Sequence, residues 1–251
     1  SQSVSITIVD DDNFSFSVAD VTVAENAGTA TITVSMSSAS ASSTTIQYTT
    51  RDVTAAAGSD YTSTNGTLTF SAGDQSETFT VSITNDSVYE GDEDFDIVIS
   101  NASAGSISDS VGVVTITDNE SAPTVTLGVS SSSIAENAGS SLTLTATLSG
   151  ATDEDITVAL DTSGTATEGT DYTDGSSNID DITISAGNTT GTVTFNPTND
   201  SVYEGNETAI IAINGVSGKS GVAENSTPQE ETITITDDES APTVTLGVSA
   251  S

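Results

Sequence analysis

The chain has 251 residues, a hydrophobic content of 34% and a formal net charge of -35, with 37 acidic residues against two basic ones. Its length supports two domains with hydrophobic cores, but a nucleic acid or an anionic membrane would require clusters of Lys and Arg that the sequence lacks. Cysteine and histidine are absent, which excludes disulfides, thiolate metal sites and the commonest general base, and leaves oxygen as the ligand atom for any metal.

Apolar residues in the first half alternate with polar ones, which is the period of a half-buried β-strand. In residues 29–36, for example, Ala30, Ile32 and Val34 alternate with threonine. No segment sustains the period of 3.6 that an amphipathic helix requires. Gly, Asn, Asp and Ser, which favour turns, separate the apolar segments. The pattern predicts strands over residues 14–24, 28–37, 44–50, 66–70, 76–83, 95–100 and 111–117.

The second half shows the same alternation. It predicts strands over residues 123–129, 133–135, 140–148, 155–160, 180–184, 189–195, 208–213 and 230–236, with the first strand broken into two pieces. Seven short strands in about 105 residues are typical of an antiparallel immunoglobulin-like sandwich. The sequence therefore predicts an all-β protein made of two such sandwiches in tandem.

Four motifs recur in the same order in both halves. They are "VAENAG" and "IAENAG" at 23–28 and 134–139, "GSDYTS" and "GTDYTD" at 58–63 and 169–174, "NDSVYEG" at 85–91 and 199–205, and "TITDNES" and "TITDDES" at 115–121 and 234–240. The first two pairs are 111 positions apart and the third is 114 apart. Repetition at this period indicates duplicated domains that differ by small loop insertions.

These repeats predict one sandwich over residues 14–120 and another over 121–238. Residues 4–13 resemble the close of each unit, so we expect residues 1–13 to be the last strand of a preceding repeat, with Asp10, Asp11 and Asp12 in its site. Residues 239–249 copy residues 120–130 letter for letter, so 239–251 are expected to be the first strand of a following repeat.

Acidic residues follow the first, third, fifth and seventh strands of each unit. If successive strands alternate in direction, those ends emerge at one tip of the sandwich, so the acids converge although they lie far apart in the chain. The candidate metal ligands of the first unit are Glu25, Asp60, Asp86, Glu90, Glu93 and Asp118. Those of the second unit are Glu136, Asp171, Asp200, Glu204, Glu207, Asp237 and Asp238.

Such clusters require a cation. Two carboxylates about 4 Å apart repel each other by roughly 4 kcal/mol at an effective dielectric constant near 20, and the chain offers only Arg51 and Lys219 as basic partners. Calcium accepts six to eight oxygen ligands in flexible geometry, whereas zinc and copper normally recruit His or Cys. The sequence therefore predicts Ca²⁺ at these loops. For the remaining acids, a solvated surface is the simpler interpretation.

The motif series resembles the Calx-beta domain family over almost the whole of both units. The resemblance implies an immunoglobulin-like sandwich that binds calcium at its distal loops, through the candidate residues named above. Some positions depart from the family pattern: Asn85 and Asn199 stand where Asp is frequent, and Asn119 replaces a terminal Asp. Fewer charges imply fewer or more weakly bound ions.

We expect a calcium-binding structural repeat of an extracellular or cell-surface adhesin or matrix protein, in which Ca²⁺ at the inter-repeat tips makes the array rod-like. The expected partners are neighbouring repeats or neighbouring chains, with a cell-surface or glycan target elsewhere in the protein, and neither nucleic acid nor membrane insertion. An alternative is a filament subunit that polymerises when end strands pair between chains. Catalysis by paired carboxylates, as in glycosidases, is not expected because no Trp or His lines a cleft.

Overall fold

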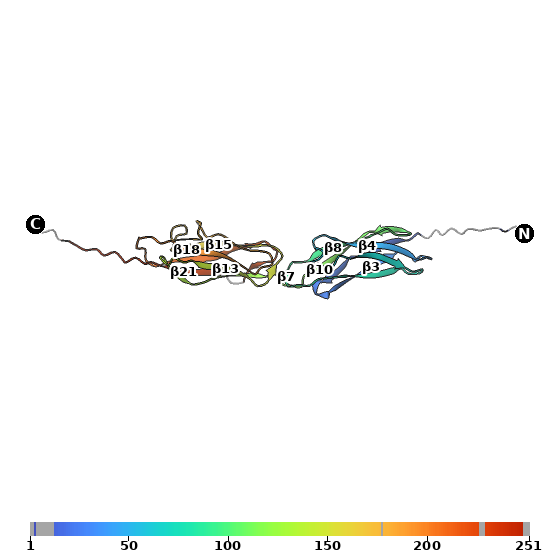
Figure 1. Cartoon of the computed structure of the whole chain (residues 1–251), viewed down its shortest axis with the longest axis horizontal. Coiled ribbons are helices and arrows are strands. Elements are labelled where there is room, and N and C mark those ends of the chain that lie inside the picture. Colours follow the sequence, from blue (N-terminus) through green and yellow to red (C-terminus); the bar gives the residue numbers. More distant parts are fainter. Residues whose placement is uncertain (1–2, 4–12, 177, 226–228, 248–251) are drawn as a thin grey trace. The chain divides into compact units, whose positions relative to one another are not determined.

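The computed structural model describes residues 3, 13–176, 178–225 and 229–247. They divide into two compact units, one within Ser1–Asp86 and Gly91–Asn119, the other within Ser87–Glu90 and Glu120–Ser251. Each unit is a two-layered β-sandwich, so the predicted all-β fold is confirmed (Figure 1). The expectations for residues 4–12, including Asp10, Asp11 and Asp12, and for residues 248–251 lie outside the described residues.

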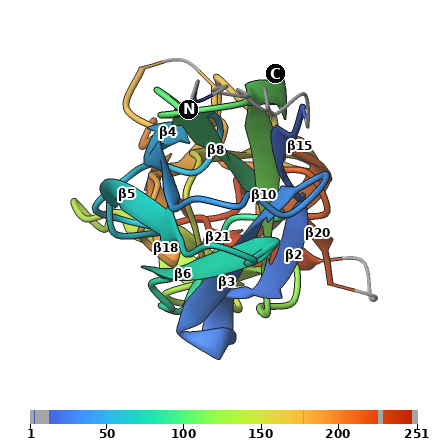
Figure 2. The ribbon, with the colours of Figure 1, turned by 90° about the vertical axis from the view of Figure 1, so that its right-hand side faces the viewer.

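Two sheets form the first unit, in the strand orders β6-β3-β1-β9 and β2-β10-β8-β4-β5 (Figure 2). A single turn of 3₁₀-helix, Glu25–Ala27, follows β2 and ends at Gly28, whose φ of 74° suits glycine. The strands are β1 (Ser15–Val18), β2 (Val21–Ala24), β3 (Thr29–Met36), β4 (Thr44–Asp52), β5 (Asn65–Phe70), β6 (Ser76–Ser82), β8 (Glu93–Ser100), β9 (Ser106–Asp109) and β10 (Val111–Thr117).

The alternating sequence of β3 explains its place in the sandwich. Ile32 and Val34 are fully buried, because successive side chains point to opposite faces of a sheet. Thr31 and Thr33 point outward and lie opposite Thr80 and Thr78 of β6. Threonine suits such positions, since its branched side chain favours the extended backbone and its hydroxyl stays hydrated. The core between the sheets includes Phe95, stacked on Tyr61 at a ring-centroid distance of 4.0 Å.

The predicted single strand over residues 14–24 is wrong, because the chain changes sheets within it. β1 pairs with β3, whereas β2 pairs in parallel with β10 of the opposite sheet. Asp20 lies between them and accepts a hydrogen bond from the Val113 amide at 2.8 Å. Antiparallel pairing dominates both sandwiches, but the two pieces of the first strand add parallel pairs at the sheet edges.

The second unit repeats this plan, with sheets in the orders β16-β18-β13-β11-β20 and β12-β21-β19-β15-β17, and with β7 and β14 as a short parallel pair. Its first strand is broken, as the sequence predicts. The strands are β7 (Val88–Tyr89), β11 (Thr124–Val129), β12 (Ser133–Ala135), β13 (Leu142–Leu148), β14 (Ala151–Thr152), β15 (Ile156–Gly164), β16 (Tyr172–Thr173), β17 (Ile182–Ile184), β18 (Thr190–Pro197), β19 (Glu207–Ser217), β20 (Ala223–Glu224) and β21 (Glu230–Thr236).

Its core is aliphatic apart from one aromatic pair. Leu144 of β13 is fully buried, and Tyr172 stacks on Phe195 at 4.7 Å between ring centroids. Gly164, at the end of β15, has a φ of 122°, and a Cβ there would lie 2.1 Å from the Thr208 carbonyl oxygen. Only glycine fits, and this close approach brings the beginning of β19, which carries Glu207, against the end of β15.

Candidate metal centres

Two groups of carboxylates gather in the loops of the second unit. Asp171, Glu204 and Glu207 form one group, and Glu136, Asp238 and Glu239 form the other. In each group, one carboxylate oxygen of every residue lies within 4.8 Å of the others. The strands set this convergence: β12 leads into Glu136, β21 leads into Asp238, and β19 begins at Glu207.

Glu136 is held in place by the backbone. Its side chain is buried, with 7% exposed, and its Oε1 accepts a hydrogen bond at 2.7 Å from the amide of Asp200. That amide lies in the "NDSVYEG" loop, 64 residues further along the chain. The loop is therefore fixed against the end of the first strand without any contribution from the Asp200 carboxylate, whose Oδ1 accepts a bond from the Val202 amide.

Asp237 joins the same loop to the last strand. Its Oδ2 accepts hydrogen bonds from the amides of Glu204, at 2.7 Å, and Gly205, and its Oδ1 accepts one from Glu239 at 2.8 Å. Burial would raise the pKa of Asp237, but these amides outweigh it and lower the pKa below its ordinary value. Asp237 is thus ionised and positions the two neighbouring glutamates.

The pKa values of the neighbouring glutamates are raised, in contrast to that of Asp237. Desolvation, followed by the charge of Asp171, raises the pKa of Glu204 and of Glu207. Desolvation and a hydrogen bond with Asp237 raise the pKa of Glu239. Like charges that raise one another's pKa values are held together against their repulsion. Without a cation, these groups therefore bind protons more readily than isolated carboxylates.

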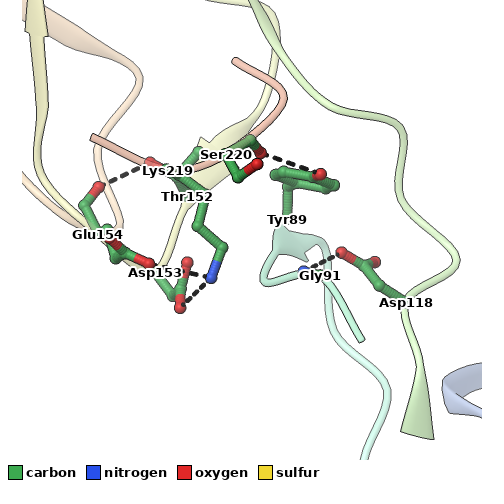
Figure 3. Close-up of polar contacts among 8 residues, drawn as sticks. All are labelled: Tyr89, Gly91, Asp118, Thr152, Asp153, Glu154, Lys219 and Ser220. Carbon is green, nitrogen blue, oxygen red and sulfur yellow. Dashed lines mark hydrogen bonds and ion pairs between the residues drawn. The ribbon is translucent and has the colours of Figure 1, made fainter. Parts of the chain in front are cut away.

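The equivalent positions of the first repeat gather in the same way. Glu25, Asp118 and Glu120 form one group, and Asp60, Glu90 and Glu93 form the other, again within 4.8 Å. Glu25 is 5% exposed, and its Oε1 accepts a hydrogen bond from the Asp86 amide at 2.8 Å. Glu136 accepts the equivalent hydrogen bond from the Asp200 amide. Asp118 accepts the Gly91 amide at 2.7 Å (Figure 3). The geometry of the loops is therefore preserved between the two repeats.

Most of the sequence-predicted ligands lie in these groups. The four groups include Glu25, Asp60, Glu90, Glu93, Asp118, Glu136, Asp171, Glu204, Glu207 and Asp238. Asp86, Asp200 and Asp237 lie outside the four groups and contact them through the backbone bonds described above. Their role as ligands stays a prediction.

Glu120 and Glu239 are members that the list of candidate ligands leaves out, although strand direction already places Glu120 with Asp118 at the end of the last strand. They occupy the same place in "TDNES" and "TDDES", so the repeat itself carried the signal. Both follow the last strand by a few residues, where a loop acid is easily taken for part of a linker.

The two basic side chains of the chain form ion pairs with acids outside these groups. Arg51 pairs with Asp96, and its Nε lies 3.1 Å from the Asp96 Oδ2. Lys219 pairs with Asp153 at 2.9 Å and with Glu154 at 3.2 Å (Figure 3). None of these acids belongs to a group. Both basic residues of the chain are therefore engaged elsewhere.

The donor set fits calcium. Every residue of the four groups is Asp or Glu, which are hard oxygen ligands of the kind that Ca²⁺ prefers. In the group of Glu136, the Oε2 atom of Glu239 is buried and accepts no hydrogen bond from the described residues. A buried carboxylate oxygen without such a bond is unfavourable unless another partner, such as a cation, reaches it. Glu136, Asp238 and Glu239 would hold the ion in this group.

No helix among the described residues is long and apolar enough to cross a membrane. The fold and the groups together define an all-β protein of two tandem sandwiches with acidic loop sites. The Calx-beta domain model matches residues 8–120 and 118–239, which is almost the whole chain. The chain therefore belongs to the Calx-beta family, whose domains bind calcium and are non-catalytic, and it contains two such domains in tandem.

The chain is similar to curated proteins over one short segment. The sodium/calcium exchanger 1 proteins of Canis lupus familiaris and Cavia porcellus are 36% identical to this chain over 69 residues, which is 28% of the chain and 7% of each exchanger. Among solved structures, the apo-form Calx CBD1 domain is 28% identical, with a TM-score of 0.41, and covers 43% of this chain and 99% of its own. The CBD12 fragment of CALX1.2 is 19% identical, with a TM-score of 0.43, and covers 89% and 99%.

Proposed function

We propose that this chain is a calcium-binding structural repeat of an extracellular or cell-surface adhesin or matrix protein. In this proposal, Ca²⁺ bound at the inter-repeat tips restricts the repeats and makes the array rod-like. The observation that carries the proposal is the gathering of Asp171, Glu204 and Glu207 within 4.8 Å, in a chain whose two basic residues pair with other acids. At neutral pH, a bound cation would relieve that repulsion.

The extracellular location is part of the proposal and assumes that the sites belong to the weak class of calcium modules. Each group combines side chains from separate loops rather than from one continuous loop, and extracellular calcium modules bind with dissociation constants of about 10⁻⁴ to 10⁻³ M. Such sites fill at the millimolar calcium found outside cells and empty at the much lower concentration inside. The neighbouring repeats of the same array are then the natural partners, and any cell-surface or glycan target belongs to other parts of the protein.

Small-angle scattering of the whole chain tests the proposal. In 2 mM calcium we expect a sharply defined maximum dimension, and after chelation a broader distribution of distances, because the restraint on the repeats is lost. A variant with Asp60→Asn and Glu93→Gln, which removes ligands of the first repeat, whose last strand leads into the second unit, should resemble the chelated protein even in calcium. An identical scattering curve with and without calcium, for a protein that calorimetry shows to bind the ion, would refute the rod while leaving calcium binding intact.

Polymerisation by strand addition is the second candidate, since it requires an exposed strand that another molecule accepts. Val244 and Leu246, at 99% and 92% exposed, provide such a segment. Sedimentation velocity distinguishes the candidates: a filament subunit grows in size with concentration, whereas a repeat of an array stays monomeric.

A further inference from the structure

The chain contains two Asn-Gly sequences, at residues 65–66 in β5 and at residues 214–215 in β19. An asparagine followed by glycine is chemically labile, because the next main-chain nitrogen can attack its side chain. Glycine has no Cβ to obstruct that approach and leaves the backbone free to turn. Both asparagines are exposed. The sequence alone therefore does not distinguish them, and the strands around them decide which one reacts.

The second Asn-Gly sequence lies in a β-bulge. Leu160 of β15 lies opposite Ile213 of β19, and the preceding residue, Ala159, lies opposite Gly215. In the described register of the two strands, Asn214 is therefore the extra residue, with no partner in β15. The extra residue of a bulge disrupts the ladder locally and bends the strand away from the regular extended conformation. The backbone at this point is thus less restrained than in an uninterrupted ladder.

The space around Gly215 is open as well. A Cβ added there would meet no atom within 4 Å, and Gly215 itself is exposed. Nothing close by therefore prevents the Gly215 nitrogen from turning toward the preceding side chain, and water reaches the same place.

The first Asn-Gly sequence lies instead in a regular antiparallel ladder. Gly66 is opposite Tyr48, and a Cβ at Gly66 would lie 2.6 Å from the Tyr48 hydroxyl oxygen. Tyr48 is itself stacked on Phe79 at 3.8 Å between ring centroids. The Thr50 amide donates to the Thr64 carbonyl at 2.9 Å. Because hydrogen-bonded pairs alternate along such a ladder, Gly66 and Tyr48 form the next one. The Gly66 nitrogen is thus both bonded and covered.

We propose that Asn214 is a site of spontaneous deamidation in the folded chain. The Gly215 nitrogen loses its proton and bonds to the Asn214 Cγ, the Cγ–Nδ2 bond breaks, and ammonia leaves, which closes a succinimide ring. Water then opens the ring at either carbonyl and leaves aspartate or isoaspartate. The reaction consumes only water, adds a negative charge, and in isoaspartate lengthens the main chain by a carbon atom.

The modified position lies away from the candidate metal groups. β19 begins at Glu207, and Asn214 is near the other end of the same strand, roughly 20 Å away at a rise of about 3.3 Å per residue. The inference therefore stands apart from the proposed function, and modification should leave the calcium affinity unchanged.

Mass spectrometry of the intact chain, aged in calcium at mildly alkaline pH, tests the proposal. Cleavage after glutamate releases residues 208–224, in which Asn214 is the only asparagine, and residues 26–77, which contain Asn65. Fragmentation then locates the modified residue in each peptide. We expect deamidation at position 214 to be at least about tenfold faster than at position 65, because a closed ladder must open before its nitrogen can attack.

A variant and an unfolded control identify the cause. Gly215→Ala should slow deamidation of Asn214 about tenfold or more, since a Cβ restricts the backbone, and the open space accommodates the substitution. In urea, the two asparagines of the natural chain should react at similar rates, because the strands are lost and glycine follows both.

Equal rates at the two positions in the folded chain, or an unchanged rate in Gly215→Ala, would overturn the proposal. A difference that persists in urea would assign the rates to the sequence rather than to the bulge and would overturn it too. Aspartate without isoaspartate at position 214 would exclude the succinimide ring.

Discussion

At the scale of single residues, some carboxylates accept hydrogen bonds from backbone amides that hold the loops, and Glu136 does so while also belonging to a candidate metal group. Glu136 and Asp237 use oxygens to accept backbone amides from the "NDSVYEG" loop. Glu204 and Glu207 have raised pKa values and receive no basic partner. The first kind positions the second, so loss of either should weaken calcium binding. Loss of Glu204 or Glu207 should also relieve repulsion without removing a hydrogen bond that holds the loop.

Glu207→Gln tests this division. We expect calcium affinity to fall about tenfold or more, which corresponds to about 1.4 kcal/mol, because a charged ligand is lost. Without calcium, the same variant should unfold at a higher temperature than the natural protein, because one repulsive charge is gone. Titration calorimetry and thermal unfolding after chelation measure the two effects.

Glu230→Gln is the matched control, since it removes the same charge at an exposed position of β21 outside the four groups. It should leave both quantities unchanged. A variant at position 207 that binds calcium normally would show that the gathered acids are a solvated surface.

Tyr61 provides a separate titration. Burial, followed by its hydrogen bond to Asp52, raises its pKa to about 12. We expect absorbance near 295 nm to show tyrosine ionisation close to pH 12, and Tyr61→Phe should reduce this late step without removing the delayed ionisation of Tyr172, whose pKa burial also raises. Because this folded-state pKa lies above the ordinary value of 10.0, the associated stability is present below pH 10 and is lost as the pH rises toward 12. A Tyr61→Phe protein with an unchanged titration would place the late step on another tyrosine.

At the scale of elements, alternation is the main determinant of each strand, and it was readable from the sequence. β3 and β13 lie where the pattern of apolar and hydroxyl residues predicts them. The change of sheets at Asp20 left a signal that the prediction did not use: apolar side chains occupy even positions up to Val18 and odd positions from Val21, so the alternation changes phase around Asp20. The hydrogen bond that Asp20 accepts from Val113, 93 residues away, required the structure. The short strands β7, β14, β16 and β20 have two residues each, too few for any period to appear.

The candidate metal sites, too, were predictable from the sequence only in part. The repeated motifs predicted which loops converge, since equal offsets and strand direction are properties of the chain itself. The hydrogen bonds from backbone amides to particular carboxylate oxygens, such as those that Glu136 and Asp200 accept, depend on loop conformation. They could be identified only from the structure.

Leu144→Ala tests the inward register of β13. Leu144 is fully buried and lies opposite Val193 of β18. Its truncation should cost about 2 to 5 kcal/mol of the free energy of unfolding, through lost burial and a residual cavity. Thr145→Ala, one position along on the outward face, should cost less than about 1 kcal/mol. Denaturant titration distinguishes the two, and similar losses would show that the register is shifted by one residue.

At the scale of the whole molecule, the charge of -35 makes stability depend on calcium and pH together. At 1 mM calcium, a site with a dissociation constant of about 10⁻⁴ M adds about 1.4 kcal/mol to the stability of the folded state. For a domain of this size, 1 kcal/mol shifts the melting temperature by about 4–8 °C. Chelation should therefore lower the melting temperature by several degrees for each occupied site, measured by scanning calorimetry.

The pH dependence should change sign when calcium is removed. The pKa values of Glu204, Glu207 and Glu239 are raised above the ordinary 4.5, so the metal-free folded protein binds protons that the unfolded chain does not. Its stability should rise as the pH falls from 7 toward about 5. Asp237, with a lowered pKa, opposes this only as the pH falls below its ordinary 3.8.

With saturating calcium the trend should reverse, since protons compete with the ion for the same oxygens. Urea unfolding at several pH values measures both series, with Glu207→Gln reducing the metal-free gain and Glu230→Gln leaving it intact. A metal-free protein that loses stability steadily from pH 7 to 5 would contradict the assignment of raised pKa values.

The bond between Glu136 and the Asp200 amide has one more consequence, for kinetics. A side chain already immobilised by the main chain does not have to search for its orientation when an ion arrives. Recapture of calcium after a brief fall in its concentration should then be limited by diffusion and by shedding of water from the ion. The loop would keep its conformation without the ion. Repeated removal and addition of calcium should therefore show no slow refolding phase.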